Sequence, residues 1–164
     1  KGTILLRRTF CKIIISWITV AINWSLYKNF SESEYECRCG CKSLKKGKAI
    51  INEELLARIQ ELRDRCGFAL PINSGLRCVQ HNINSGGHKS SAHCDEGQGC
   101  MAVDLGVDRE KGRIVLQIAL EMGCFEGIGV AQRGKSGRFL HLDIKKRATD
   151  PTSGKTSKAF WSYA

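Results

Sequence analysis

Apolar side chains recur at the spacing of an α-helix in two stretches of the chain. Between Asn52 and Cys66 they form a single stripe, made of Leu55, Leu56, Ile59 and Leu62. Asn52 is a favourable N-cap, and Gly67 is a residue type that commonly ends a helix. The same kind of pattern predicts a second helix over 109–122, ended by Gly123.

Shorter segments alternate between apolar and polar residues, as half-buried β-strands do. They are residues 69–75, 101–105, 127–131 and 139–144. The last two flank a glycine-containing turn at 132–137, so we expect them to form a hairpin. Helices that alternate with short strands ending in a hairpin predict an α+β fold, with a small antiparallel sheet flanked by helices.

The N-terminal part of the chain has a different character. An apolar run at 13–26 follows Arg7, Arg8 and Lys12, which is typical of a signal peptide or signal anchor. The run is shorter than the roughly 20 residues of a membrane-spanning helix. The apolar run could serve export or membrane anchoring, or it could be a segment foreign to the domain, and the sequence leaves both alternatives open. We place residues 1–28 outside a domain at 29–164, and expect membrane contact only if this apolar leader is a genuine signal or anchor.

Length and charge narrow the class of protein. The chain has 164 residues, enough for one domain with a single core. It carries 26 Lys and Arg against 16 Asp and Glu, a net charge of +10, which favours polyanionic surroundings such as nucleic acid, anionic lipid or bacterial wall polymers. No nucleic-acid-binding motif is evident, so a basic nucleic-acid binder is only a remote alternative. We expect a monomer with no nucleic-acid partner.

Polar side chains interrupt two of the predicted strands. Asp104 lies between Val103 and Leu105, and burying a carboxylate without a partner is costly. His141 lies in similar surroundings in the segment FLHLDI. A hydrolytic zinc site needs three protein ligands and one open position. His93, Asp104 and His141 would supply two imidazoles and one carboxylate, and a Zn²⁺ ion would neutralise the buried charge.

Four short motifs follow one another along the chain. They are Ser74-Gly75-Leu76-Arg77, Ser91-Ala92-His93, Gly99 followed by Ala102-Val103-Asp104, and Phe139-Leu140-His141-Leu142-Asp143. A single motif of this kind is weak, whereas four in this order are specific. From about Phe30 to Tyr163 the chain resembles the zinc D-alanyl-D-alanine carboxypeptidase family. The fold group of that family also contains the hedgehog signalling domain and several phage endolysins.

This resemblance implies a metal site and an activity. The zinc ligands would be His93, Asp104 and His141. Arg77 would face the substrate, where a guanidinium can hold a carboxylate or a developing oxyanion. The substrate would be a peptidoglycan stem peptide, cut at a D-alanyl-D-alanine or similar D-amino-acid bond. The protein would then act from the cell envelope or periplasm, or as a phage-encoded enzyme on the cell wall. His81 also matches the family pattern, and we expect it to hold a turn.

The general base is not assigned by the resemblance. Related zinc peptidases carry an acid three positions before the last ligand, where this chain has Arg138. Asp143 shares a strand face with His141 and is the best local candidate. It could take a proton from water or only orient the ligand, and we favour the second role. Asp95 and Glu96 are weaker candidates. The missing acid also supports a non-catalytic zinc-binding module of the same fold as an alternative function.

Nine cysteines are many for this length. Ten residues separate His93 from Asp104, more than the family usually has, and Cys94 and Cys100 bracket this insertion. They could form a disulfide or remain buried thiols. The segment CRCGC, residues 37–41, has a closer spacing than a usual zinc knuckle and shows no evident partner pair. We therefore favour packing or disulfide roles for its cysteines over a structural zinc site.

Overall fold

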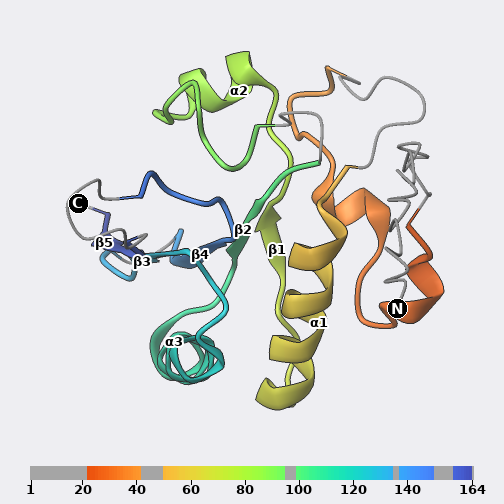
Figure 1. Cartoon of the computed structure of the whole chain (residues 1–164), viewed down its shortest axis with the longest axis vertical. Helices are drawn as coiled ribbons and strands as arrows, with labels where there is room; N and C mark the ends of the chain where they lie inside the picture. The colour runs from red at the N-terminus through yellow and green to blue at the C-terminus, as the bar shows by residue number, and fades with distance from the viewer. Residues whose placement is uncertain (1–21, 42–49, 95–98, 135–136, 150–156, 164) are drawn as a thin grey trace, which may run out of the picture.

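The fold is organised around a five-stranded sheet with the strand order β1-β2-β4-β3-β5 (Figure 1). The computed structural model describes residues 22–41, 50–94, 99–134, 137–149 and 157–163. The strands are β1 (Ile72–Ser74), β2 (Ala102–Leu105), β3 (Gly127–Ala131), β4 (Phe139–Asp143) and β5 (Ala159–Ser162). The helices in the described residues are the 3-10 helices η1 (Trp24–Leu26) and η2 (Glu32–Tyr35) and the α-helices α1 (Glu53–Cys66), α2 (Val79–Asn84) and α3 (Arg109–Met122).

The predicted α+β class and the β3–β4 hairpin are both present. β4 pairs antiparallel with β3 and with β2, and β2 pairs antiparallel with β1. The predicted antiparallel pairing is present in these three strand pairs, and β5 adds a parallel pairing with β3 at the edge of the sheet. The chain leaves β4 and returns beside β3 in the same direction, so the sheet is mixed. Residues Ala159, Phe160, Trp161 and Ser162 give no clear apolar–polar alternation, and sequence pattern did not assign this strand.

Both predicted long helices form, and their apolar stripes pack into the core. The side-chain oxygen of Asn52 accepts the backbone N–H of Glu54 at 3.0 Å, which caps α1 as expected. Leu55, Leu56, Ile59 and Leu62 of α1 are fully buried. Each such side chain contributes about 1.5–3 kcal/mol of burial free energy. In the view of Figure 1, α2 lies above the central strands and α3 lies below them.

The described N-terminal residues pack against the same core. Tyr27, Phe30 and Tyr35 are buried, and the Tyr27 hydroxyl donates to Glu53 at 3.2 Å. The ring of Trp24 lies 5.9 Å from that of Tyr35, measured between centroids. Residues 1–21, which hold most of the apolar leader, lie outside the described residues, and the boundary at residue 29 stays a prediction. Within the part of the chain that the structure describes, no helix is both long and apolar enough to cross a membrane.

Candidate metal centre

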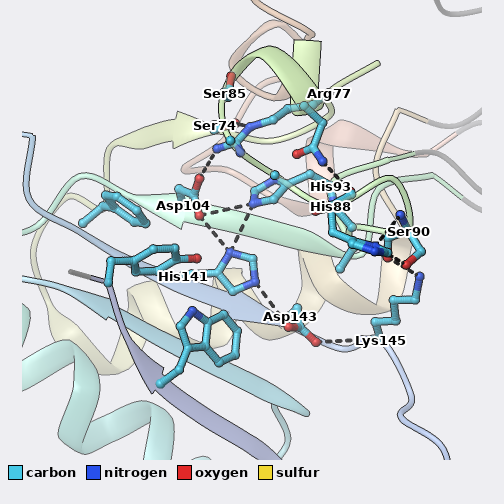
Figure 2. A pocket seen from close by; sticks show the side chains of 18 of the residues that line it. Ser74, Arg77, Ser85, His88, Ser90, His93, Asp104, His141, Asp143 and Lys145 are labelled. Atoms are coloured by element: carbon cyan, nitrogen blue, oxygen red, sulfur yellow. Dashed lines mark hydrogen bonds and ion pairs between the residues drawn. The ribbon is translucent and has the colours of Figure 1, made fainter. Parts of the chain in front are cut away.

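Three elements bring the predicted ligands together. Asp104 in β2 and His141 in β4 are direct partners in the antiparallel register, so their side chains share one face of the sheet. His93 reaches them from the segment that follows α2 (Figure 2). All three residues are buried. The strand alternation that the sequence showed around Asp104 and His141 therefore turns both side chains into a common site.

The three candidate ligand atoms form a nearly equilateral triangle. Nε2 of His93 lies 3.2 Å from Oδ1 of Asp104 and 3.1 Å from Nδ1 of His141. The third side, from Nδ1 of His141 to Oδ1 of Asp104, measures 2.9 Å. Ligands at about 2.0–2.2 Å from a tetrahedral zinc ion are separated by roughly 3.3–3.5 Å. The triangle is therefore close to the size that one zinc ion requires.

Hydrogen bonds on the far side of each imidazole determine which nitrogen faces the triangle. Nδ1 of His93 lies 2.7 Å from the carbonyl oxygen of Gly75, so this nitrogen carries the proton and donates it. Nε2 of His141 lies 3.2 Å from Oδ2 of Asp143 and donates in the same way. When both rings are neutral, as metal binding requires, the two nitrogens that face Asp104 are acceptors, as is the carboxylate. Three hydrogen-bond acceptors this close repel one another unless a cation lies between them. The three side chains therefore suit a metal ion as their common partner.

Arg77 holds the second oxygen of the central carboxylate. Its guanidinium donates to Oδ2 of Asp104 and, through Nε, to the hydroxyl of Ser74 at 2.7 Å. Burial alone would raise the pKa of the Asp104 carboxyl, but hydrogen bonds with His141 and His93 outweigh this and hold the pKa well below its usual value. Asp104 is therefore ionised and oriented to offer one oxygen to a metal. Arg77 also lines the cleft, where its predicted contact with substrate stays a prediction.

Asp143 lies behind His141, away from the ligand triangle (Figure 2). Arg147 donates to both of its oxygens, at 3.0 and 2.9 Å, and the backbone N–H of Lys145 adds a bond of 3.0 Å. Burial raises the pKa of Asp143, but hydrogen bonds with His141 and Arg147 lower it by more. The pKa is therefore below its usual value, and the carboxylate stays charged. This arrangement favours the orienting role over that of a general base. Gly127 makes room for it, since a Cβ atom there would come within 2.0 Å of the Asp143 carboxylate.

An open cleft of about 970 Å³ gives access to the triangle. Its lining includes the basic residues Lys145, Lys146 and Arg147 and the aromatic residues Phe139, Trp161 and Tyr163, called here the aromatic wall. The Trp161 ring lies 5.2 Å from that of His141, measured between centroids. It can approach because position 129 is glycine, where a Cβ atom would stand 2.7 Å from the indole. The Trp161 ring therefore lies beside His141, a candidate ligand.

Arg138 does not take the place of a catalytic acid. Its side chain donates to the carbonyl oxygens of Gln132 and Gly134 and lies 3.5 Å from Asp108. Among the described residues that line the cleft, the acidic ones are Asp104 and Asp143. Asp95 and Glu96, the weaker sequence candidates for a base, lie outside the described residues.

Comparison with known families adds an independent observation. The family model described as Peptidase M15 matches residues 28–143, which is more than half of the chain. The chain belongs to the peptidase M15 family. This confirms the resemblance to zinc D-alanyl-D-alanine carboxypeptidases drawn from the four motifs, and it supports a metallopeptidase. A comparison with curated proteins found no match.

The M15 match covers the three candidate ligands but not every residue at the site. Arg147, Trp161 and Tyr163 follow residue 143 and contact or face the ligand-bearing part of the cleft. No sequence pattern assigned a role to Trp161. The charge of Arg147 in a basic run gave no signal that it pairs with Asp143. Only the return of the chain beside β3 brings the two aromatic residues to the site.

Two further expectations concern residues around α2 and the insertion. His81 does not simply hold a turn, because its Nδ1 lies 3.2 Å from the sulfur of Cys37. The neighbouring Asn82 has that role, since its amide donates to the carbonyl of His88 at 2.6 Å. Cys94 and Cys100 are both buried, which is compatible with both alternatives, a disulfide and two buried thiols.

Proposed function

We propose that this M15 peptidase uses zinc to hydrolyse D-amino-acid-containing peptide bonds in peptidoglycan stem peptides, as a D-alanyl-D-alanine carboxypeptidase or an endolysin-like peptidase. The observation that carries the proposal is the triangle of His93, Asp104 and His141 acceptor atoms at the floor of an open cleft. Three protein ligands leave a fourth position for water or substrate, as hydrolytic zinc sites need.

Each residue of the site then has a separate task. His93, Asp104 and His141 would hold the ion, while the Gly75 carbonyl and Asp143 orient the two imidazoles. When bound, zinc polarises a carbonyl group and lowers the pKa of its water to about 7. Arg77 fixes Asp104 and borders the cleft, where a guanidinium can stabilise charge that develops on a carbonyl oxygen.

The charge of the cleft supports an anionic peptide as substrate. Stem peptides end in a carboxylate, and Lys146 is exposed at the cleft beside the half-buried Lys145 and Arg147. Nζ of Lys145 donates to the carbonyl oxygen of Ser90 at 2.8 Å. These basic residues attract the carboxylate end of a peptide, and Trp161 and Tyr163 of the aromatic wall can pack on its apolar side chains.

One observation favours the alternative of a zinc-binding module without hydrolysis. Both acidic residues among the described lining of the cleft are engaged: Asp104 by Arg77 and the imidazoles, and Asp143 by His141 and Arg147. Neither is placed to accept a proton at the open side of the triangle. The two functions share the metal centre and differ in turnover.

Mass spectrometry of digested peptidoglycan separates them. Purified protein is incubated with stem peptides and with intact wall material, with zinc and with a chelator. Loss of a terminal D-alanine or cleavage of a cross-link, abolished by chelator and by His141→Ala, is the expected result. Arg133→Ala serves as a matched control, because Arg133 is exposed and absent from the described lining of the cleft. Zinc-loaded protein that leaves every peptide intact would favour the non-catalytic module.

A further inference from the structure

A second group of metal-binding side chains lies away from the metal centre. The sulfur atoms of Cys37, Cys39, Cys41 and Cys78 all lie within 4.8 Å of one another. We propose that these four cysteines, called here the thiolate cluster, hold a structural zinc ion that fixes the wall of the cleft carrying Arg77. The sequence shows no evident partner for CRCGC, because the fourth cysteine lies far along the chain at the start of α2.

The sulfur positions fit one tetrahedral ion better than disulfides. Sγ of Cys39 lies 3.3 Å from Sγ of Cys37 and 3.6 Å from Sγ of Cys78. Four sulfurs bound to zinc at about 2.3 Å are separated by roughly 3.8 Å. A disulfide would draw two sulfurs to about 2.05 Å and leave the others without that partner. Here one sulfur has two neighbours at similar distances, as around a shared ion.

The local backbone structure brings the cysteines close together. Gly40 has a φ of +71°, a left-handed conformation that glycine adopts without strain, and it lets the chain turn between Cys39 and Cys41. Arg38 donates to the carbonyl oxygen of Ile72 at 2.7 Å, which fastens this turn to β1. Cys39 and Cys41 are exposed, so an ion can reach the cluster from solvent.

Hydrogen-bond donors surround the sulfur atoms, as they commonly surround the ligands of a bound metal ion. The backbone N–H of Cys78 donates to Sγ of Cys37 at 3.3 Å, and the N–H of His81 donates to Sγ of Cys78 at 3.3 Å. Nδ1 of His81 lies 3.2 Å from Sγ of Cys37. Donors aimed at sulfur stabilise the thiolate form that binds zinc. His81 is the residue we assign to the outer surroundings of the ion.

Charge gives a further reason for a cation at the cluster. Four thiolates this close cannot coexist without a positive charge between them. A zinc ion would displace the protons and neutralise half of the resulting charge, as in closed four-cysteine sites.

The position of Cys78 links the thiolate cluster to the metal centre. Cys78 directly follows Arg77, which holds Asp104, and the backbone N–H of Leu76 donates to the backbone carbonyl oxygen of Tyr35 at 2.8 Å. A zinc ion bound to Cys78 would therefore tie residues 37–41 to the segment that carries Arg77. With four protein ligands it has no open position, so its role is structural.

Zinc content and zinc-edge X-ray absorption of protein purified under reducing conditions test the proposal. Wild-type protein is expected to hold two zinc ions per chain, and His141→Ala to hold one whose neighbours are all sulfur. Cys39→Ser combined with Cys78→Ser should leave one ion with nitrogen and oxygen neighbours. Cys124→Ser is the matched control, because Cys124 is half-buried and outside the thiolate cluster, and it should keep both ions.

The result that overturns the proposal is zinc without sulfur neighbours in the wild-type spectrum, which needs no variant to fold. Disulfides among the four cysteines in zinc-replete, reduced protein would overturn it equally. The outcome is independent of peptidase activity. An active protein with a single nitrogen- and oxygen-bound zinc refutes the thiolate cluster alone, whereas an inactive protein with sulfur-bound zinc refutes only the proposed hydrolysis.

Discussion

At the residue scale, hydrogen bonds on the outer side of each ligand decide what the metal centre can hold. The carbonyl oxygen of Gly75 and the carboxylate of Asp143 accept hydrogen bonds from His93 and His141. Arg77 donates a hydrogen bond to one oxygen of Asp104. The remaining three acceptors are directed at one point. A substitution of a single side chain at this centre is therefore expected to change metal affinity first, and turnover as a consequence.

Asp143→Asn tests the orienting role of Asp143. The amide cannot accept from both His141 and Arg147 as the carboxylate does, so zinc affinity should fall roughly 10–100-fold. Saturating zinc should restore much of the turnover, measured alongside a zinc titration with a competing chelator. If Asp143 were the general base, affinity would stay unchanged while turnover fell about 10²–10⁴-fold at every zinc concentration.

Protonation of His141 should compete with zinc. Burial lowers the pKa of His141, but hydrogen bonds with Asp104 and Asp143 outweigh it and raise the pKa above 6.5. A raised pKa stabilises the metal-free fold fully below the unfolded pKa, and this contribution is lost as pH rises through the folded pKa. Zinc requires the neutral ring. The rise in melting temperature on adding zinc should thus be larger at pH 8 than at pH 6. An equal rise at both values would contradict this reading.

The sequence indicated the ligands but not their supports, for a physical reason. Asp104 and His141 are polar residues in short apolar strands, and such a position signals a buried charge that needs a partner. Arg147 and Trp161 act through contacts between segments distant in sequence, and a basic or aromatic residue in an exposed segment carries no such signal. Cys78 and His81 were unassigned as partners of CRCGC because only the fold brings them to it.

At the element scale, the mixed sheet positions the cleft. β4 lies between β2 and β3, so His141 has Asp104 on one side and Gly129 on the other. β5 then brings Trp161 over the position where Gly129 lacks a side chain. The two long helices were predictable from their stripes and end signals. β5 was not, because its exposed edge position leaves too little pattern in four residues.

Gly129→Ala should disturb the aromatic wall without removing a ligand. The added Cβ would meet the indole of Trp161 at 2.7 Å, so the ring or β5 must shift. We expect a loss of about 1–3 kcal/mol in the free energy of unfolding, with zinc retained and turnover reduced. Thermal unfolding, zinc content and peptide hydrolysis measure the three effects.

The double variant Gly129→Ala with Trp161→Ala supplies the control. If the clash with the indole is the cause, the stability cost of Gly129→Ala should shrink in the Trp161→Ala background. The same cost in both backgrounds would place the effect in the strand backbone and not in the aromatic wall.

At the scale of the whole molecule, described N-terminal residues contribute to the core that supports the sheet. A chain that begins at Ile22 keeps the contacts of Trp24 with Tyr35 and of Tyr27 with Glu53. Its free energy of unfolding serves as the reference for a shorter chain. A chain that begins at Asn29 should fold but lose about 3 kcal/mol or more, the usual effect of removing a large buried aromatic side chain. Chemical denaturation compares them, and equal stability of the two shortened chains would show that residues 22–28 contribute nothing.

The central claim is that His93, Asp104 and His141 bind one zinc ion at the floor of the cleft. Anomalous diffraction at the zinc absorption edge, from crystals grown with zinc, tests it most directly. A peak should lie about 2.0–2.2 Å from Nε2 of His93, Oδ1 of Asp104 and Nδ1 of His141, with a fourth position open to the cleft. Zinc-replete crystals with no anomalous peak inside that triangle would contradict the account.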